Sequence, residues 1–319
     1  MGNFVAKIRR TLPDRLRQKM TRPRATGEKR AVRQESRLSM SQVAGAFLRG
    51  FLVILLVLVP ALLLPGISQD VSQGVTLVAL IAGIVVVVEY TARHPGLIEF
   101  RDAKPYNRGR FLLLFTIILA LTLTQRQFLM AEHSTPAPAF LFIGSLFDFS
   151  VSPVRLLTAS LPPGLSEAHL FNVHLAASMA FLLALLGALG FLITVWLNYW
   201  PSRASVLNVW VNLPNFDPTK GIDVVHRLER EGQFYILLGI ILPFSLPVLL
   251  HVSNLLVQPL TLETPLSLVW GVGLWAFVPI SLVMRGVAMY RVAQLIRAQR
   301  RRIAEEEAAV PLPAQSVYS

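Results

Sequence analysis

Six long apolar segments, separated by polar connections, dominate the pattern of this sequence. An α-helix rises about 1.5 Å per residue, so roughly 20 apolar residues cross the ~30 Å hydrocarbon core of a bilayer. None of the six segments carries an Asp or Glu near its middle. We therefore predict an all-α polytopic membrane protein with spans at about residues 44–64, 71–90, 111–129, 171–200, 234–257 and 265–290.

Positive charge is divided very unevenly between the two sets of connections. Of the 30 Lys and Arg residues, 28 lie within residues 1–49, in the connections at 91–110 and 201–233, or from Arg285 onward. The remaining two, Arg126 and Arg155, lie at 125–170, on the other side. Because Lys/Arg-rich connections stay in the cytoplasm, this division predicts that the N- and C-termini are both cytoplasmic.

The two ends of the chain are expected to behave differently. Residues 1–43 are basic with few apolar positions, which predicts a largely disordered cytoplasmic arm. Residues 291–319 begin with an apolar stripe opposite several arginines, which predicts an amphipathic helix followed by a frayed tail. Basic segments of both kinds are attracted to anionic lipid headgroups.

The cytoplasmic connections at 91–110 and 201–233 are dense in charge and offer a binding surface for a partner. In the 201–233 connection, the segment before residue 214 fits either an interfacial helix or a strand, because its apolar residues match both the helical and the alternating pattern. A short amphipathic helix leads from there into the fifth span, with an acid and an arginine four residues apart. The candidate interaction residues of the two connections are Arg101, Asp102, Lys104, Asp223 and Arg227.

The largest connection on the outer side contains amphipathic segments at 138–161, which we interpret as interfacial helices, with a re-entrant loop as the alternative. Ser152 and Pro153 are typical of the N-cap and first position of a helix. Asp148 is placed to pair with Arg155.

Small residues recur at four-residue spacing in the fourth span, at Ala176, Ala180, Ala184 and Ala188. Residues at this spacing lie on one helix face and allow neighbouring helices to approach closely. We interpret this stripe as an internal packing surface.

Composition excludes several classes of protein. The chain is 54% hydrophobic and 15% charged, whereas a soluble domain is about 25% charged. It contains 0 cysteines, which excludes disulfides, Cys-ligated zinc or iron–sulfur clusters and thiol catalysis. The net charge is +12, and arginine outnumbers lysine by 25 to 5, as is typical of chains from GC-rich bacterial genomes.

A transport path has one candidate. Ion-coupled carriers usually need an ionisable group at mid-membrane, and the apolar segments lack one. Prolines free backbone carbonyls and kink helices, and such irregular helices line transport sites. The candidate residues, all in the fifth span, are Pro243, Ser245 and Pro247.

Two histidines are candidate ligands for a metal or a haem. His174 begins the fourth span and His251 ends the fifth, so both are expected at similar depth on the outer side. No metal-binding spacing such as HExxH accompanies them, and we expect no cofactor.

Catalytic motifs are missing from the sequence, since it has no P-loop, no GxGxxG and no GxSxG. The leading hypothesis is a non-catalytic accessory, assembly or scaffold subunit that engages partners through its basic cytoplasmic face. The alternatives are a transporter or channel for a small solute and a haem- or metal-binding membrane protein. We expect a multi-pass protein of the bacterial inner membrane, with anionic lipid and other membrane proteins as partners and no nucleic acid; the sequence leaves the oligomeric state open.

Overall fold

The computed structural model describes residues 40–92, 96–101, 103, 106–130, 138–201, 212–213, 223–256 and 261–309. The segment before Met40, Asp102 and Lys104, the ambiguous segment at 203–211 and the tail from 310 therefore lie outside the described residues. Within the described part the chain is helical, without strands.

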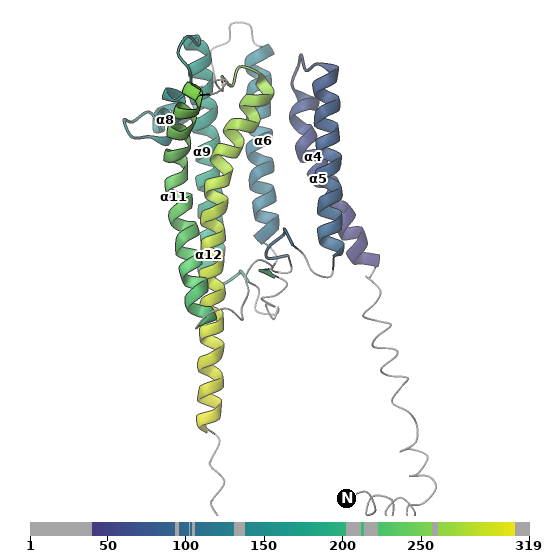
Figure 1. Ribbon diagram of the computed structural model, residues 1–319, viewed down its shortest axis with the longest axis vertical. Coiled ribbons are helices and arrows are strands. Elements are labelled where there is room, and N and C mark those ends of the chain that lie inside the picture. The colour runs from purple at the N-terminus through teal and green to yellow at the C-terminus, as the bar shows by residue number, and fades with distance from the viewer. Residues whose placement is uncertain are drawn as a thin grey trace, which may run out of the picture.

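Six helices are long enough and apolar enough to cross a membrane, which confirms the predicted number of spans. They run side by side along the long axis of the molecule (Figure 1). Their bounds are α4 (Met40–Leu63), α5 (Gln69–Thr91), α6 (Tyr106–Met130), α9 (Glu167–Trp196), α11 (Val224–Leu256) and α12 (Pro265–Ala309).

Two of these helices are longer than the sequence predicts. Helix α11 begins at Val224 rather than at residue 234, because the short amphipathic segment before the fifth span is continuous with it. Helix α12 continues without a break to Ala309, so the sixth span and the amphipathic segment after it are one helix. Both extensions lie at the same end of the bundle (Figure 1).

That end is called the basic end below. Helices α4, α6 and α11 begin there, and α5, α9 and α12 end there (Figure 1). The opposite end carries two short helices, α7 (Pro138–Leu146) and α8 (Pro153–Ala159), which pack against α9. The predicted start of α8 is confirmed, because the Ser152 hydroxyl accepts a hydrogen bond from the Val154 backbone N–H at 3.2 Å. The Asp148–Arg155 pair also forms, with 3.8 Å between the charged atoms.

Helices α6, α9, α11 and α12 make the packed core. The predicted alanine stripe of α9 is buried throughout, at Ala176, Ala180, Ala184 and Ala188. Near the opposite end, the buried side-chain amides of Gln125 and Asn172 donate hydrogen bonds to each other at 2.9 and 3.0 Å. This reciprocal pair satisfies two polar side chains that would otherwise be costly to bury.

Helices α4 and α5 form a hairpin at one side of this core (Figure 1). The two helices cross closely at Gly50 and Gly83, where a Cβ atom on Gly50 would lie 2.9 Å from the Gly83 carbonyl oxygen. Helix α4 in turn contacts α6. The α4–α5 hairpin is therefore tightly packed internally, and it contacts the core mainly through α4. This arrangement leaves space between the hairpin and the core.

Glycine is required where α11 crosses α12. A Cβ atom on Gly239 would lie 2.5 Å from the Pro279 carbonyl oxygen, and one on Gly286 would lie 2.5 Å from the Gly232 carbonyl oxygen. Backbone atoms cannot move aside as a flexible side chain can. We expect Gly239→Ala and Gly286→Ala each to lower the free energy of unfolding by about 1–3 kcal/mol, because the helices must separate. Thermal unfolding in detergent measures this.

Gly190→Ala in α9 is the matched control, since its Cβ would enter open space. Alanine has the higher helix propensity, so this substitution should be neutral or slightly stabilising. Equal unfolding temperatures for the three variants would contradict the assigned crossing.

Candidate functional site

A cleft of about 1030 Å³ lies at the basic end, between the α4–α5 hairpin and helices α6 and α12. Part of its wall comes from the connection between α5 and α6. Its charged lining residues are Glu99 and five arginines, and its apolar wall comes mainly from α4 and α6. The arginines are Arg49, Arg101, Arg108, Arg110 and Arg285.

On each helix that lines the cleft, a charged residue or Tyr90 lies toward the basic end, and most of the apolar lining residues lie deeper. On α6, Arg108 and Arg110 come before Phe111 and Phe115, and α6 begins at the basic end. On α12, which ends there, Leu282 comes before Arg285. Likewise Leu52 and Leu55 follow Arg49 on α4, and Val86 precedes Tyr90 on α5. The cleft therefore has a charged mouth at the basic end and an apolar wall deeper among the helices.

An ion pair at short distance joins Glu99 to Arg285 in the cleft. The Arg285 Nη2 atom lies 2.5 Å from the Glu99 Oε1 atom, and the two side chains are only 22% and 10% exposed. The Arg285 guanidinium also lies over the Tyr235 ring of α11, 3.8 Å from its centroid. Burial raises the pKa of the Glu99 carboxyl, although the positive charge of Arg285 opposes this. The pair thus fastens the α5–α6 connection to α12.

The connection is folded so that it presents Glu99 to α12. The Glu89 carboxylate, in the last turns of α5, accepts backbone N–H bonds from Gly96 and Leu97 at 3.0 Å and from Ile98 at 3.2 Å. Arg101 donates to the carbonyl oxygens of Glu89 at 3.1 Å and Ala92 at 2.7 Å. These bonds turn the chain back across the end of α5.

An aromatic cluster holds the other side of this connection. Phe100, Tyr106 and Trp200 are buried and in mutual ring contact, with centroids 4.7 to 5.6 Å apart. The Trp200 indole N–H donates to the Ala103 carbonyl oxygen at 2.9 Å. Asn107 donates to the Glu99 carbonyl oxygen at 2.7 Å. The position of Glu99 is therefore fixed by α5, α6 and the chain after α9 together.

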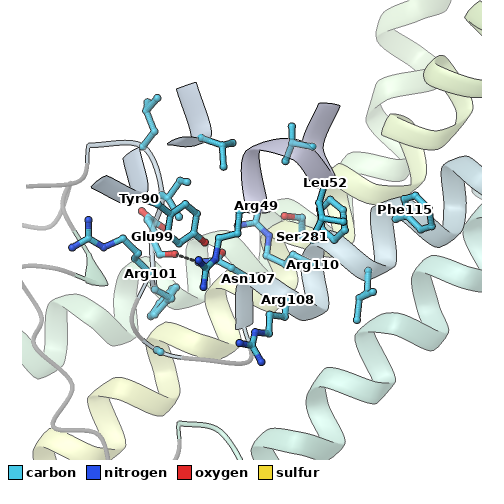
Figure 2. A pocket seen from close by; sticks show the side chains of 18 of the residues that line it. Arg49, Leu52, Tyr90, Glu99, Arg101, Asn107, Arg108, Arg110, Phe115 and Ser281 are labelled. Atoms are coloured by element: carbon cyan, nitrogen blue, oxygen red, sulfur yellow. Dashed lines mark hydrogen bonds between the residues drawn. The ribbon is translucent and has the colours of Figure 1, made fainter. Parts of the chain in front are cut away.

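Two further arginines of the cleft lie over aromatic rings. The guanidinium of Arg49 is 4.5 Å from the Tyr90 centroid and donates to the Gly45 carbonyl oxygen at 2.6 Å. That of Arg110 is 5.5 Å from the Tyr106 centroid. The Nε atoms of Arg110 and Arg285 are buried and have no hydrogen-bond partner among the described residues. Figure 2 shows Arg49, Tyr90, Glu99 and Asn107 close together, while Arg101 and Arg108 extend away from them.

The candidate interaction residues of the connections fall in two places. Arg101 lines the cleft, whereas Asp102 and Lys104 lie outside the described residues. Asp223 pairs with Arg300 of α12 at 2.8 Å, and this hydrogen bond lowers the pKa of the exposed Asp223 carboxyl. Arg227 lies 3.7 Å from Glu231 on its own helix.

The Asp223–Arg300 pair belongs to a polar interface between the extensions of α11 and α12. Arg297 of α12 lies 2.6 Å from Glu229 of α11, parallel to the Asp223–Arg300 pair. Arg291 also donates a hydrogen bond to Asn198, beyond the end of α9. The interface joins the two helices where they extend past the spans.

The transport candidates lie elsewhere. Helix α11 stays helical through Pro243 and Pro247, and the Ser245 hydroxyl donates to the Leu242 carbonyl oxygen at 3.4 Å. None of the three lines the cleft. A transport path through them stays a prediction.

The histidine candidates are also distant from the cleft. The His174 Nε2 atom lies 3.1 Å from the Gly144 carbonyl oxygen, and His251 is exposed on α11. In the described part of the chain, no group of three or more His, Asp or Glu side chains is arranged to hold a metal ion. Metal or haem binding by His174 and His251 stays a prediction.

Sequence reasoning missed the Glu99–Arg285 pair. The two residues are 186 positions apart, and no periodicity relates them. A signal was nevertheless present, because Arg285 is the sole charged residue within the sixth apolar segment, and an ionisable group there requires a partner. The sequence alone could not choose that partner from the acids of several connections.

Comparison with protein-family models, with curated proteins and with solved structures found no match to this chain. The site is therefore interpreted from its own chemistry. Guanidinium groups bind phosphate and carboxylate oxygens, and an apolar wall binds hydrocarbon. A ligand that combines an acidic group with an apolar chain would satisfy both parts of the cleft.

The Glu99–Arg285 pair should be essential to the stability of the basic end. We expect Arg285→Met to lower the free energy of unfolding by up to about 3 kcal/mol, because it leaves a buried carboxylate without its counter-charge. Without Arg285 the pKa of Glu99 rises further. The loss of unfolding free energy should therefore become smaller as the pH is lowered and the Glu99 carboxyl becomes protonated. Thermal unfolding between pH 5 and pH 8 measures both effects.

The double variant Glu99→Gln/Arg285→Met provides the control. It removes the unpaired charge, so it should be more stable than Arg285→Met at pH 8 and nearly independent of pH. A single variant that is as stable as the wild type at pH 8 would contradict the pairing.

Proposed function

We propose that this protein is a non-enzymatic multi-pass membrane protein that binds an anionic amphiphile in the cleft at its basic end. The observation that carries the proposal is the shared polarity of the four helices that line the cleft: arginines or Tyr90 lie toward the mouth, and most of the apolar residues lie deeper. A membrane presents lipids in the same order, with headgroups outside and hydrocarbon chains inside. Anionic phospholipid is the ligand class that fits this arrangement.

The charge of the mouth supports an acidic headgroup. Five arginines line the cleft with a single glutamate among the described lining residues. One of the five is neutralised by Glu99, and the others leave an excess of positive charge. Arginine binds phosphate oxygens with two parallel hydrogen bonds, and these are stronger where surrounding groups exclude water.

The apolar wall supports an acyl or similar chain. Leu52, Leu55, Phe111 and Phe115 all line the deeper part of the cleft. Its volume of about 1030 Å³ is at the upper end of the ~300–1000 Å³ typical of small-molecule sites. A water-soluble anion would leave this wall uncovered.

The orientation of the chain completes the proposal. The distribution of Lys and Arg supports a cytoplasmic location for the basic end, and hence a mouth at the inner leaflet of a bacterial inner membrane. Anionic lipids give the cytoplasmic leaflet its negative surface potential. An accessory or scaffold subunit that binds such a lipid, and contacts other membrane proteins beside it, is consistent with the paired extensions of α11 and α12.

Lipid binding can be measured as a shift in unfolding temperature. We expect dioctanoyl phosphatidylglycerol to stabilise the full chain in non-ionic detergent, and dioctanoyl phosphatidylcholine or glycerol phosphate to have little effect. The first comparison tests the charged mouth, and the second tests the apolar wall. Equal shifts with phosphatidylglycerol and phosphatidylcholine would contradict the role of the arginines.

The double variant Arg49→Gln/Arg110→Gln should bind phosphatidylglycerol at least tenfold more weakly. Each hydrogen bond to a charged group contributes about 1.5–3 kcal/mol, and about 1.4 kcal/mol corresponds to tenfold in affinity. Arg126→Gln is the matched control, because Arg126 is an exposed arginine near the other end of the same helix as Arg110. If Arg126→Gln weakened binding as much, the lipid would not be bound in the cleft.

A further inference from the structure

We propose that Glu99 determines the affinity of the cleft, because its carboxylate occupies the place of a ligand oxygen on Arg285 and must yield it when an acidic headgroup binds. The inference rests on the proposed function and names the residue that regulates it. It follows from the position of Glu99, which is the sole acid among the described residues that line the cleft.

Glu99 and a headgroup would compete for the same donor. Arg285 lines the cleft, and its Nη2 atom is 2.5 Å from the Glu99 carboxylate. The two side chains are 22% and 10% exposed, so water screens the contact only weakly. An incoming phosphate meets both an arginine that is already paired and the repulsion of a nearby carboxylate.

The groups around Glu99 carry more positive charge than its carboxylate offsets. Glu99 also interacts electrostatically with Arg110 of α6, so two arginines share one carboxylate. The buried Nε atoms of both arginines lack hydrogen-bond partners among the described residues. This cluster therefore keeps an excess of positive charge, which an acidic headgroup can offset.

The groups that face Glu99 come from three helices. Arg285 belongs to α12 and Arg110 to α6, while Glu231 and Tyr235 belong to α11, with Tyr235 under the Arg285 guanidinium. Glu231 repels Glu99 and so favours its protonation, as does burial, and the pKa of Glu99 is raised in consequence. Protonation of Glu99 frees Arg285, so binding of an anion and binding of a proton should assist each other.

The test uses dioctanoyl phosphatidylglycerol, whose phosphodiester keeps a single charge between pH 5 and pH 8. We expect the wild type to bind this lipid at least tenfold more tightly at pH 5 than at pH 8. The lipid keeps its charge over this range, whereas protonation of Glu99 releases Arg285 for the headgroup. Glu99→Gln should bind about tenfold more tightly than the wild type at pH 8 and change less than threefold between the two pH values. Affinity is measured by titration of the full-length protein in non-ionic detergent.

Three matched variants test whether Glu99 acts by competing for Arg285. Glu231→Gln removes a neighbouring carboxylate but leaves Glu99 on Arg285, so it should keep most of the pH dependence. Glu99→Asp retains the acid and should keep it as well. The double variant Glu99→Gln/Arg285→Met should lose the gain in affinity at pH 8, since the freed donor is gone.

The outcomes distinguish this inference from the proposed function. If the wild type and Glu99→Gln bind phosphatidylglycerol equally at every pH, while Arg49→Gln/Arg110→Gln binds weakly, the cleft binds lipid and the inference about Glu99 is wrong. The same holds if Glu99→Gln binds more weakly than the wild type, because Glu99 would then position Arg285 for the ligand. If neither the wild type nor Glu99→Gln binds at any pH, both proposals fail.

Discussion

A guanidinium group held among apolar helices requires a counter-charge, and the structure at the basic end depends on how Arg285 obtains one. Its partner, Glu99, comes from a connection 186 residues earlier in the chain. The connection can supply that carboxylate because Glu89 accepts three of its backbone N–H groups and Arg101 caps the end of α5. One ion pair thereby fixes how the hairpin side of the molecule meets α12.

The cleft results from unequal packing around this pair. Helices α11 and α12 are joined so closely that glycine is required at their crossing, and α9 presents a face of buried alanines to its neighbours. Helices α4 and α5 are joined equally closely to each other at Gly50 and Gly83. Two tightly packed units that meet along α4 and α6 leave a space between them. Arginines from both units line the mouth of this space and make it positively charged.

The same arginines are held by different interactions, and this difference gives the site its proposed chemistry. Arg101 is engaged with backbone carbonyls, Arg49 lies over Tyr90, and Arg285 is shared between Glu99 and the Tyr235 ring. Ring contacts orient a guanidinium and leave its N–H donors available to an anion. Glu99 differs from the rings and backbone carbonyls because it is a titratable acid on an arginine donor, and so the affinity of the cleft would depend on its charge.

Sequence patterns correctly predicted the six spans, the alanine face of α9 and the start of α8 at Ser152 and Pro153. These features follow from local rules, namely the length needed to cross hydrocarbon, the spacing of residues on one helix face and the geometry of a helix end. The tertiary structure was needed to show that Asp223 pairs with Arg300, that α11 and α12 extend past their spans, and that Glu99 meets Arg285. An ion pair forms between groups that the fold brings close, which can be far apart in sequence. An apolar helix has the same residue pattern whichever helix it packs against. The local sequence therefore predicts neither the ion pairs nor the helix neighbours.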